Sequence, residues 1–485
     1  MRCDPLLTGG FSCHVAIDTR RPHGGDAFKA RFIGPAIVGA TVKDLCGGRY
    51  EAAAVLVDAG EYHFELYFEA LSYSGYMGSV QPAKGKCIEQ PKYCPPVRLG
   101  ATTMRFLDYI AWHNEVHSKV LGQRVALLPV PTLNFSKECE AFKRHPCSGS
   151  RREMAGRWVR SSCITATPHC VLGNGQLIRE MGAEYVWVPW ACVLRIYTTP
   201  EVRHCLGADK SLVVVGKSTS RNVMFELANL ERSTPLANYS SEHMQELNLY
   251  SHGGEGFTAR FYVLGAFKIE HLLEPQVNPG ASALPAPALW NPGLWVNGLP
   301  HRPVPCANPE PSGLRPATAV IINDGLWAIY ASEPLASYVD RLSRRVKEFA
   351  GVAAKRQARL LWRSTTVVHT NVERLSMLAT DAEAHPNHRG KVCQTTNSVA
   401  NTVQYNEAAA RVMDAYNVSI VDVFPITTFR WDRSYDCMHF FPCDACGYAH
   451  KSLDFERSNS VMVTHAILTG LCGTSMGTPA DSSTL

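Results

Sequence analysis

Ser218, Asp436 and His439 are of the residue types that together activate a hydroxyl group for attack on an ester carbonyl. In such a set the imidazole takes the serine proton, and the carboxylate orients the imidazole. Asp436 and His439 are three residues apart in YDCMHFF, so the carboxylate can accept the Nδ1 proton while Nε2 faces a serine. This pattern predicts acyl transfer through a covalent intermediate on Ser218.

Ser218 lies between a stretch that predicts a buried strand and a stretch that predicts a helix. Residues 212–215 are a continuous apolar run, Gly216 interrupts it, and residues 219–230 carry apolar side chains at helical spacing. Ser218 is therefore expected at the carboxyl end of a strand, where open α/β sheets bind ligands and a helix N-terminus offers free N–H groups. The alternative is that Ser218 and Thr219 only cap the helix.

The rest of the chain predicts two folded regions. Short alternating runs between residues 12 and 75 predict an antiparallel β-sandwich. Strands and helices alternate over residues 211–439, which predicts an α/β fold with a doubly wound parallel sheet. We therefore predict a sandwich domain at 1–80, a Cys- and Pro-rich connector at 81–150, an α/β domain at 151–475 and a disordered tail at 476–485.

The composition argues against some partners and favours one compartment. The 485 residues carry a formal net charge of only +5 and show no basic stripe, so no nucleic-acid partner is expected. The 17 cysteines, mostly scattered singly, favour disulfides, and we expect the secretory pathway, in the Golgi lumen or outside the cell. No stretch is apolar enough for a leader peptide or long enough for a membrane span, so we expect that a leader is missing from the sequence. The alternative is a cytosolic protein with free thiols.

Two other groups of residues could bind a metal. His113 and His117 lie one helical turn apart, and Cys443 and Cys446 form a C-x-x-C pair. Neither pair has the further ligands that zinc requires, so no metal site is predicted.

The tryptophans offer two roles. Trp290 and Trp295 lie in the Pro- and Gly-rich stretch 275–316, which we interpret as a rim over the site with both rings as sugar platforms. Trp158, Trp187 and Trp190 lie in short apolar runs, and we expect them to pack in the core, although Trp187 or Trp190 could instead stack on a sugar.

Several motifs together resemble one branch of hydrolases. VVVGKSTSRN resembles the GDS and SRN nucleophile block, DCMH the D-x-x-H block, and NDGLW the third block of the PC-esterase branch of SGNH/GDSL hydrolases. GRWVRSSC and YVWVPWACVL resemble the G-x-W and W-x-P-x-x-C blocks of that branch. It includes the trichome-birefringence-like polysaccharide O-acetyltransferases, sialic-acid O-acetyltransferases and the NXPE (neurexophilin and PC-esterase) proteins. The V-x-D, G-x-Y and A-G-E-Y patterns near the N-terminus resemble filamin-type repeats and the Ig-like module of NXPE proteins.

The resemblance implies a three-layer SGNH-like domain after an Ig-like (filamin-type) sandwich, and a two-step transfer of acetyl groups. Ser218 is expected to attack the acetyl donor, with His439 as the base and Asp436 as its orienting acid. Asn323 and the Ser218 amide are expected to hold the oxyanion. Turn chemistry alone would also explain Asn323 and the two residues after it.

The resemblance also implies partners, and one position departs from the family. Arg221 of the SRN motif is expected to bind substrate, as are Trp290 and Trp295. The expected acceptor is a carbohydrate or glycoprotein, and an acetyl donor such as acetyl-CoA would be a substrate, so no cofactor is expected. Lys217 stands where GDS has an acidic residue, which reverses a charge beside Ser218. The alternative function is therefore a catalytically inactive secreted glycoprotein that binds glycans or protein partners.

Overall fold

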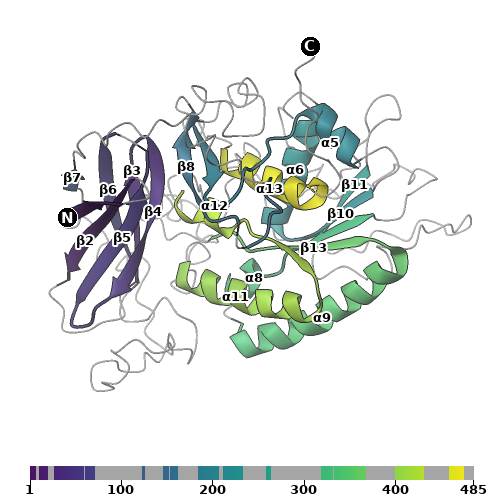
Figure 1. The fold of residues 1–485 in the computed structure, drawn as a ribbon. Coiled ribbons are helices and arrows are strands. Elements are labelled where there is room, and N and C mark those ends of the chain that lie inside the picture. Colours follow the sequence, from purple (N-terminus) through teal and green to yellow (C-terminus); the bar gives the residue numbers. More distant parts are fainter. Residues whose placement is uncertain are drawn as a thin grey trace, which may run out of the picture.

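The computed structural model contains a curled antiparallel sheet at the N-terminal end and a parallel sheet with helices further along the chain (Figure 1). This mixed α/β architecture confirms the predicted order of an all-β region followed by an α/β region. The structure describes residues 1–6, 10–19, 27–58, 60–70, 123–125, 146–151, 153–161, 184–206, 211–232, 258–263, 318–330, 333–367, 399–430 and 458–473.

The antiparallel sheet has nine strands among the described residues. They are β1 Arg2–Pro5, β2 Phe11–Asp18, β3 Ala27–Ile33, β4 Ala36–Asp44, β5 Arg49–Leu56, β6 Tyr62–Ala70, β7 Gln123–Val125, β8 Gly156–Arg160 and β9 Tyr185–Pro189. In β5 every second residue is buried, namely Tyr50, Ala52, Ala54 and Leu56, because successive side chains of a strand point to opposite faces. One face of the sheet therefore forms the core, as the alternating sequence predicts.

Strand β4 belongs to two halves of this sheet, and the sheet curls around it. Its residues 41–44 pair with β5, whereas residues 37–40 pair with β3, and Ala36 and Ile37 pair with β8. Strands β8 and β9 pair with each other. Residues 156–160 and 185–189, which we predict to belong to the second domain, therefore contribute two strands to the N-terminal sheet.

The second sheet has five strands, and all of its pairs are parallel. They are β10 Ser211–Gly216, β11 Thr258–Val263, β12 Ala319–Ile322, β13 Arg359–Arg363 and β14 Ser419–Val421. In space the order is β11-β10-β12-β13-β14, so the direction in which strands are added reverses at β10. In open α/β sheets, ligands bind at the carboxyl ends of the strands where the order reverses.

Helices cover both faces of the parallel sheet (Figure 1). They are α5 Thr199–Leu206, α6 Ser218–Arg232, α8 Leu326–Tyr330, α9 Leu335–Arg356, α11 Val399–Ala415, α12 Phe424–Thr428 and α13 Ser458–Cys472. Val214 and Ile321 pack in a core with residues of α6 and α13, whereas Val213 and Ile322 pack in another with residues of α9 and α11. Both faces are buried, which explains why β10 and β12 are continuous apolar runs.

The two sheets are joined through α12 and the residue that follows it. The Trp158 indole of β8 donates to the Ile426 carbonyl oxygen at 2.9 Å, and Arg31 Nη1 of β3 donates to the Phe429 carbonyl oxygen at 2.6 Å. The Phe429 ring lies against Gly39, where a Cβ atom would collide with it. One apolar core runs through both parts and contains Trp158 and Trp187, as predicted for these two rings.

Three disulfides join pairs of described cysteines. They are Cys3–Cys13, Cys147–Cys192 and Cys205–Cys472. The last connects α5 to the end of α13 across 267 residues of sequence.

Several predicted features lie outside the described residues. These are His113 and His117 of the connector, the Cys443 and Cys446 pair, and the tail at 476–485. In the described part of the chain, no helix has both the length and the apolar character that a membrane span requires. Within the same ranges, no group of three or more His, Cys, Asp or Glu is placed to hold a metal ion.

Candidate functional site

The carboxyl ends of β10 and β12 lie side by side where the strand order reverses. Strand β10 ends at Gly216, and α6 begins at Ser218 after a single intervening residue. The Ser220 N–H closes this turn by donating to the Lys217 carbonyl oxygen at 2.9 Å. A side chain at Gly216 would collide with the Ser220 hydroxyl, so the tight turn requires glycine. The predicted strand–turn–helix around Ser218 is therefore present.

The structure describes only part of the predicted catalytic set. For Ser218 and Arg221 it describes the backbone, at the first and fourth positions of α6. Asp436 and His439 lie outside the described residues. So do the two tryptophans expected to bind sugar, Trp290 and Trp295. The contact between Ser218 and its predicted base stays a prediction.

Asn323, the predicted oxyanion donor, follows β12 and is buried. Its Nδ2 donates to the Arg363 carbonyl oxygen at 2.9 Å and to Thr365 Oγ1 at 3.1 Å. Its backbone N–H donates to the Val215 carbonyl oxygen at 3.0 Å. Both side-chain hydrogens therefore join β12 to the end of β13, and donation to an oxyanion would require one of them to change partner.

Lys217, the departure from the GDS pattern, lies beside a buried carboxylate. Asp324 forms ion pairs with Arg341 and with Arg345, the latter at 2.6 Å. Burial raises the pKa of Asp324, and the two guanidinium groups partly oppose this rise. Burial lowers the pKa of Lys217, and the Asp324 charge opposes that effect. The Lys217 ammonium lies 5.3 Å from the centre of the Trp327 ring. Both this aromatic ring and the Asp324 carboxylate therefore attract the positive charge that replaces the acid of the GDS pattern.

Arg363 is a site residue that the sequence analysis missed. It is the last residue of β13, it is buried, and its Nη2 donates to Thr219 Oγ1 at 3.0 Å and to Ser220 Oγ at 3.2 Å. Arg363 therefore holds the first turn of α6, the helix that begins at Ser218, by two hydrogen bonds. The one available signal was an arginine at the end of the apolar run ARLLW, where a buried strand meets the ligand-binding edge.

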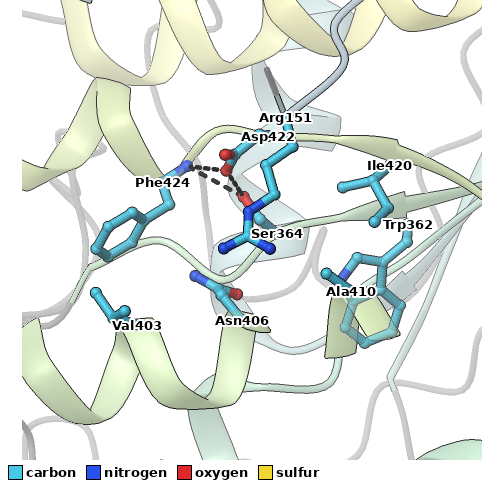
Figure 2. A pocket seen from close by; sticks show the side chains of 9 residues that line it. All are labelled: Arg151, Trp362, Ser364, Val403, Asn406, Ala410, Ile420, Asp422 and Phe424. Atoms are coloured by element: carbon cyan, nitrogen blue, oxygen red, sulfur yellow. Dashed lines mark hydrogen bonds between the residues drawn. The ribbon is translucent and has the colours of Figure 1, made fainter. Parts of the chain in front are cut away.

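One cavity at this edge lies between β13, β14 and α11 and has a volume of about 110 Å³ (Figure 2). Asp422 in its wall accepts hydrogen bonds on Oδ1 from Ser364 Oγ at 2.7 Å and from the Phe424 N–H at 3.2 Å. Burial raises the pKa of Asp422, and these two hydrogen bonds oppose the rise. Figure 2 shows the Arg151 side chain extending past Asp422 toward Asn406. The cavity thus offers an acid and a guanidinium group to a small polar ligand.

Another cavity, of about 20 Å³, lies on the opposite face of the sheet, against α6 and α13. Its wall includes Arg363 and Thr219, so it adjoins the turn that carries Ser218.

Comparison with known proteins adds no family to these observations, since no protein-family model and no curated protein sequence matches the chain.

Proposed function

We propose that the chain is an acyltransferase or esterase of the PC-esterase type, acting on O-acetyl groups of glycans or glycoproteins. The observation that carries the proposal is the position of Ser218. It begins α6 at the carboxyl end of β10, beside the reversal of strand order, where doubly wound sheets place the groups that act on ligands. The same order supports a three-layer SGNH-like fold for this part. The curled antiparallel sheet supports an Ig-like module before it.

The proposed reaction has two steps, each balanced in its protons. The Ser218 hydroxyl attacks the carbonyl carbon of the acetyl donor while His439, oriented by Asp436, takes the hydroxyl proton. The leaving group departs with that proton. A sugar hydroxyl or water then attacks the acetyl-serine and gives its proton to His439. His439 passes this proton to Ser218 as the acetyl group leaves the serine. The Ser218 amide at the start of α6 is the proposed oxyanion donor, joined by Asn323 if one of its present hydrogen bonds is exchanged.

The three described disulfides support the secretory pathway as the proposed compartment, because such bonds persist in oxidising environments.

A fluorogenic acetyl ester and a fluorophosphonate that labels activated serines test the proposal on the full chain. The protein is expected to hydrolyse the ester and to carry the phosphonate on Ser218 in peptide mass spectrometry. Ser218→Ala should abolish the label, and both Ser218→Ala and His439→Gln should lower turnover by about 10³-fold or more.

Two variants of exposed residues serve as controls for this experiment. Ser337→Ala in α9 and His204→Gln in α5 change the same residue types on the surface and are expected to keep labelling and turnover. The proposal is wrong if the folded wild-type protein neither turns over the ester nor accepts the label on Ser218.

One observation favours a second candidate function, that of a glycan- or protein-binding glycoprotein without catalysis. Both Nδ2 hydrogens of Asn323 are bonded within the protein, as in a residue whose role is to join two strand ends. Binding of O-acetylated and de-acetylated oligosaccharides by a protein that fails the labelling experiment would support this candidate. Consumption of the acetyl group during that binding assay would contradict it.

A further inference from the structure

Arg363 carries a buried guanidinium group for which the described residues provide no opposite charge. The residue is 1% exposed, and two of its nitrogens, Nε and Nη1, have no hydrogen-bond partner in the described part of the chain. Its third nitrogen, Nη2, donates to the two neutral hydroxyls of Thr219 and Ser220. Burial lowers the pKa of Arg363 to about 9, and no carboxylate of the described residues opposes this effect.

A guanidinium group normally keeps its charge in proteins, and a buried charge is costly unless it is paired and hydrogen-bonded. We therefore expect an acceptor that carries negative charge beside the Arg363 guanidinium group. Water could accept the two hydrogen bonds but would leave the charge unbalanced.

The small cavity beside Arg363 has a mainly apolar wall that also contains a few polar groups, which such an acceptor needs. Thr366 Oγ1 is buried in its wall without a partner among the described residues, and Asn222 and Ser460 also line it. A volume of about 20 Å³ admits one or two water-sized atoms and is too small for a phosphate or sulfate.

We propose that this cavity binds one small inorganic anion of halide size, held by Nε and Nη1 of Arg363 and by the hydroxyl of Thr366. The site lies between β13, α6 and α13, and the anion balances the charge of the guanidinium group that bonds to the first turn of α6. The inference does not rest on the proposed function, since it concerns the charge of Arg363 whether or not Ser218 is a nucleophile.

Thermal unfolding of the full chain in chloride and in gluconate at equal ionic strength tests the proposal. Gluconate is too large for the cavity, so it controls for screening of surface charge. The melting temperature is expected to rise by about 2 °C or more from chloride-free buffer to saturating chloride, and bromide should replace chloride. A melting temperature that does not distinguish halides from gluconate would overturn the proposal.

Variants then assign the effect to the cavity. Arg363→Met removes the charge and keeps a long apolar side chain, so it should fold and lose the chloride response. Arg345→Met is the matched control, because the Arg345 guanidinium is paired with Asp324, and it should keep the response. Thr366→Val removes one donor and should raise the half-saturating chloride concentration about tenfold. A chloride response retained in Arg363→Met contradicts the proposal; if that variant does not fold, an unchanged half-saturation in Thr366→Val contradicts it equally.

Discussion

At the scale of single residues, the buried His465 makes the stability of the folded protein depend on pH. The residue is fully buried in α13, its Nδ1 accepts a hydrogen bond from the Tyr197 N–H at 3.1 Å, and its ring stacks on that of Tyr197. Burial lowers the pKa of His465 to about 3, and the nearby Glu201 charge opposes this effect without cancelling it. The folded protein therefore holds the imidazole neutral.

The expected consequence is a loss of stability in mild acid. The unfolded chain binds a proton on this histidine below its ordinary pKa of 6.5, whereas the folded protein does so only near pH 3. The contribution of His465 is therefore complete above about pH 6.5 and is lost as the pH falls toward 3. Between pH 7.5 and pH 5 it should lower the free energy of unfolding by about 2 kcal/mol.

Urea unfolding of the wild type, His465→Gln and His204→Gln at pH 7.5 and pH 5 measures this contribution. Glutamine keeps an acceptor for the Tyr197 N–H but does not titrate, so His465→Gln should lose less stability than the wild type between the two pH values. His204 is exposed, and its variant should behave as the wild type does. An equal loss in His465→Gln and in the wild type would contradict the assignment.

For single residues, the place relative to strands and helices was predictable from the sequence, whereas the hydrogen-bond partners of the side chain were not. The apolar run before Gly216 and the helical spacing after it place Ser218 at a strand–helix junction, since both patterns are local. The hydrogen bonds of Asn323 to Arg363 and Thr365 join residues about 40 apart in sequence, and no spacing rule indicates them. For the same reason the buried guanidinium of Arg363 became apparent only in the structure.

At the scale of elements, an ion pair ties the loop between β5 and β6 to β8. Arg157 Nε and Nη2 donate to the Asp58 carboxylate at 2.6 and 2.9 Å, and both side chains are buried. Tyr62 donates to the Asp58 carbonyl oxygen, and the Arg157 guanidinium lies over the Trp190 ring. The pair therefore fixes the place where β8 joins the N-terminal sheet.

Removing one charge of this pair should destabilise the protein strongly. Asp58→Asn leaves the Arg157 guanidinium buried without a counter-charge, and the free energy of unfolding is expected to fall by about 3–5 kcal/mol. The exposed pair Arg2–Asp4 provides the control, and Asp4→Asn should change the free energy of unfolding by no more than about 0.5 kcal/mol. Urea midpoints of both variants give the comparison, and similar midpoints for the two would refute the structural role of the buried pair.

Which elements form was largely predictable, but which of them pair was not. The described residues between 211 and 421 show the expected alternation of strands and helices, because the apolar pattern that predicts each element is local. The attachment of β8 to β4 depends on residues more than 100 apart, so the sequence pattern could not reveal that this segment extends the N-terminal sheet.

At the scale of the whole molecule, buried apolar residues of both sheets belong to one continuous core. Trp158 was expected to be buried, but its partner, the Ile426 carbonyl oxygen, comes from the far end of the α/β part. The chain enters the α/β part from the N-terminal sheet and returns to that sheet through α12, so unfolding of one part should expose the core of the other.

The disulfide Cys205–Cys472 links α5 to the end of α13, and its removal tests how much this cross-link contributes to the free energy of unfolding. It spans 267 residues, whereas Cys3–Cys13 spans 10 between the neighbouring strands β1 and β2. Because a cross-link restricts the unfolded chain more when the loop is longer, the Cys205→Ala/Cys472→Ala variant should lose about 5 kcal/mol of unfolding free energy, and Cys3→Ala/Cys13→Ala about 3 kcal/mol. Guanidinium unfolding under non-reducing conditions measures both losses. A smaller loss for the long loop than for the short one would show that the link between α5 and α13 does not restrict the unfolded chain as proposed.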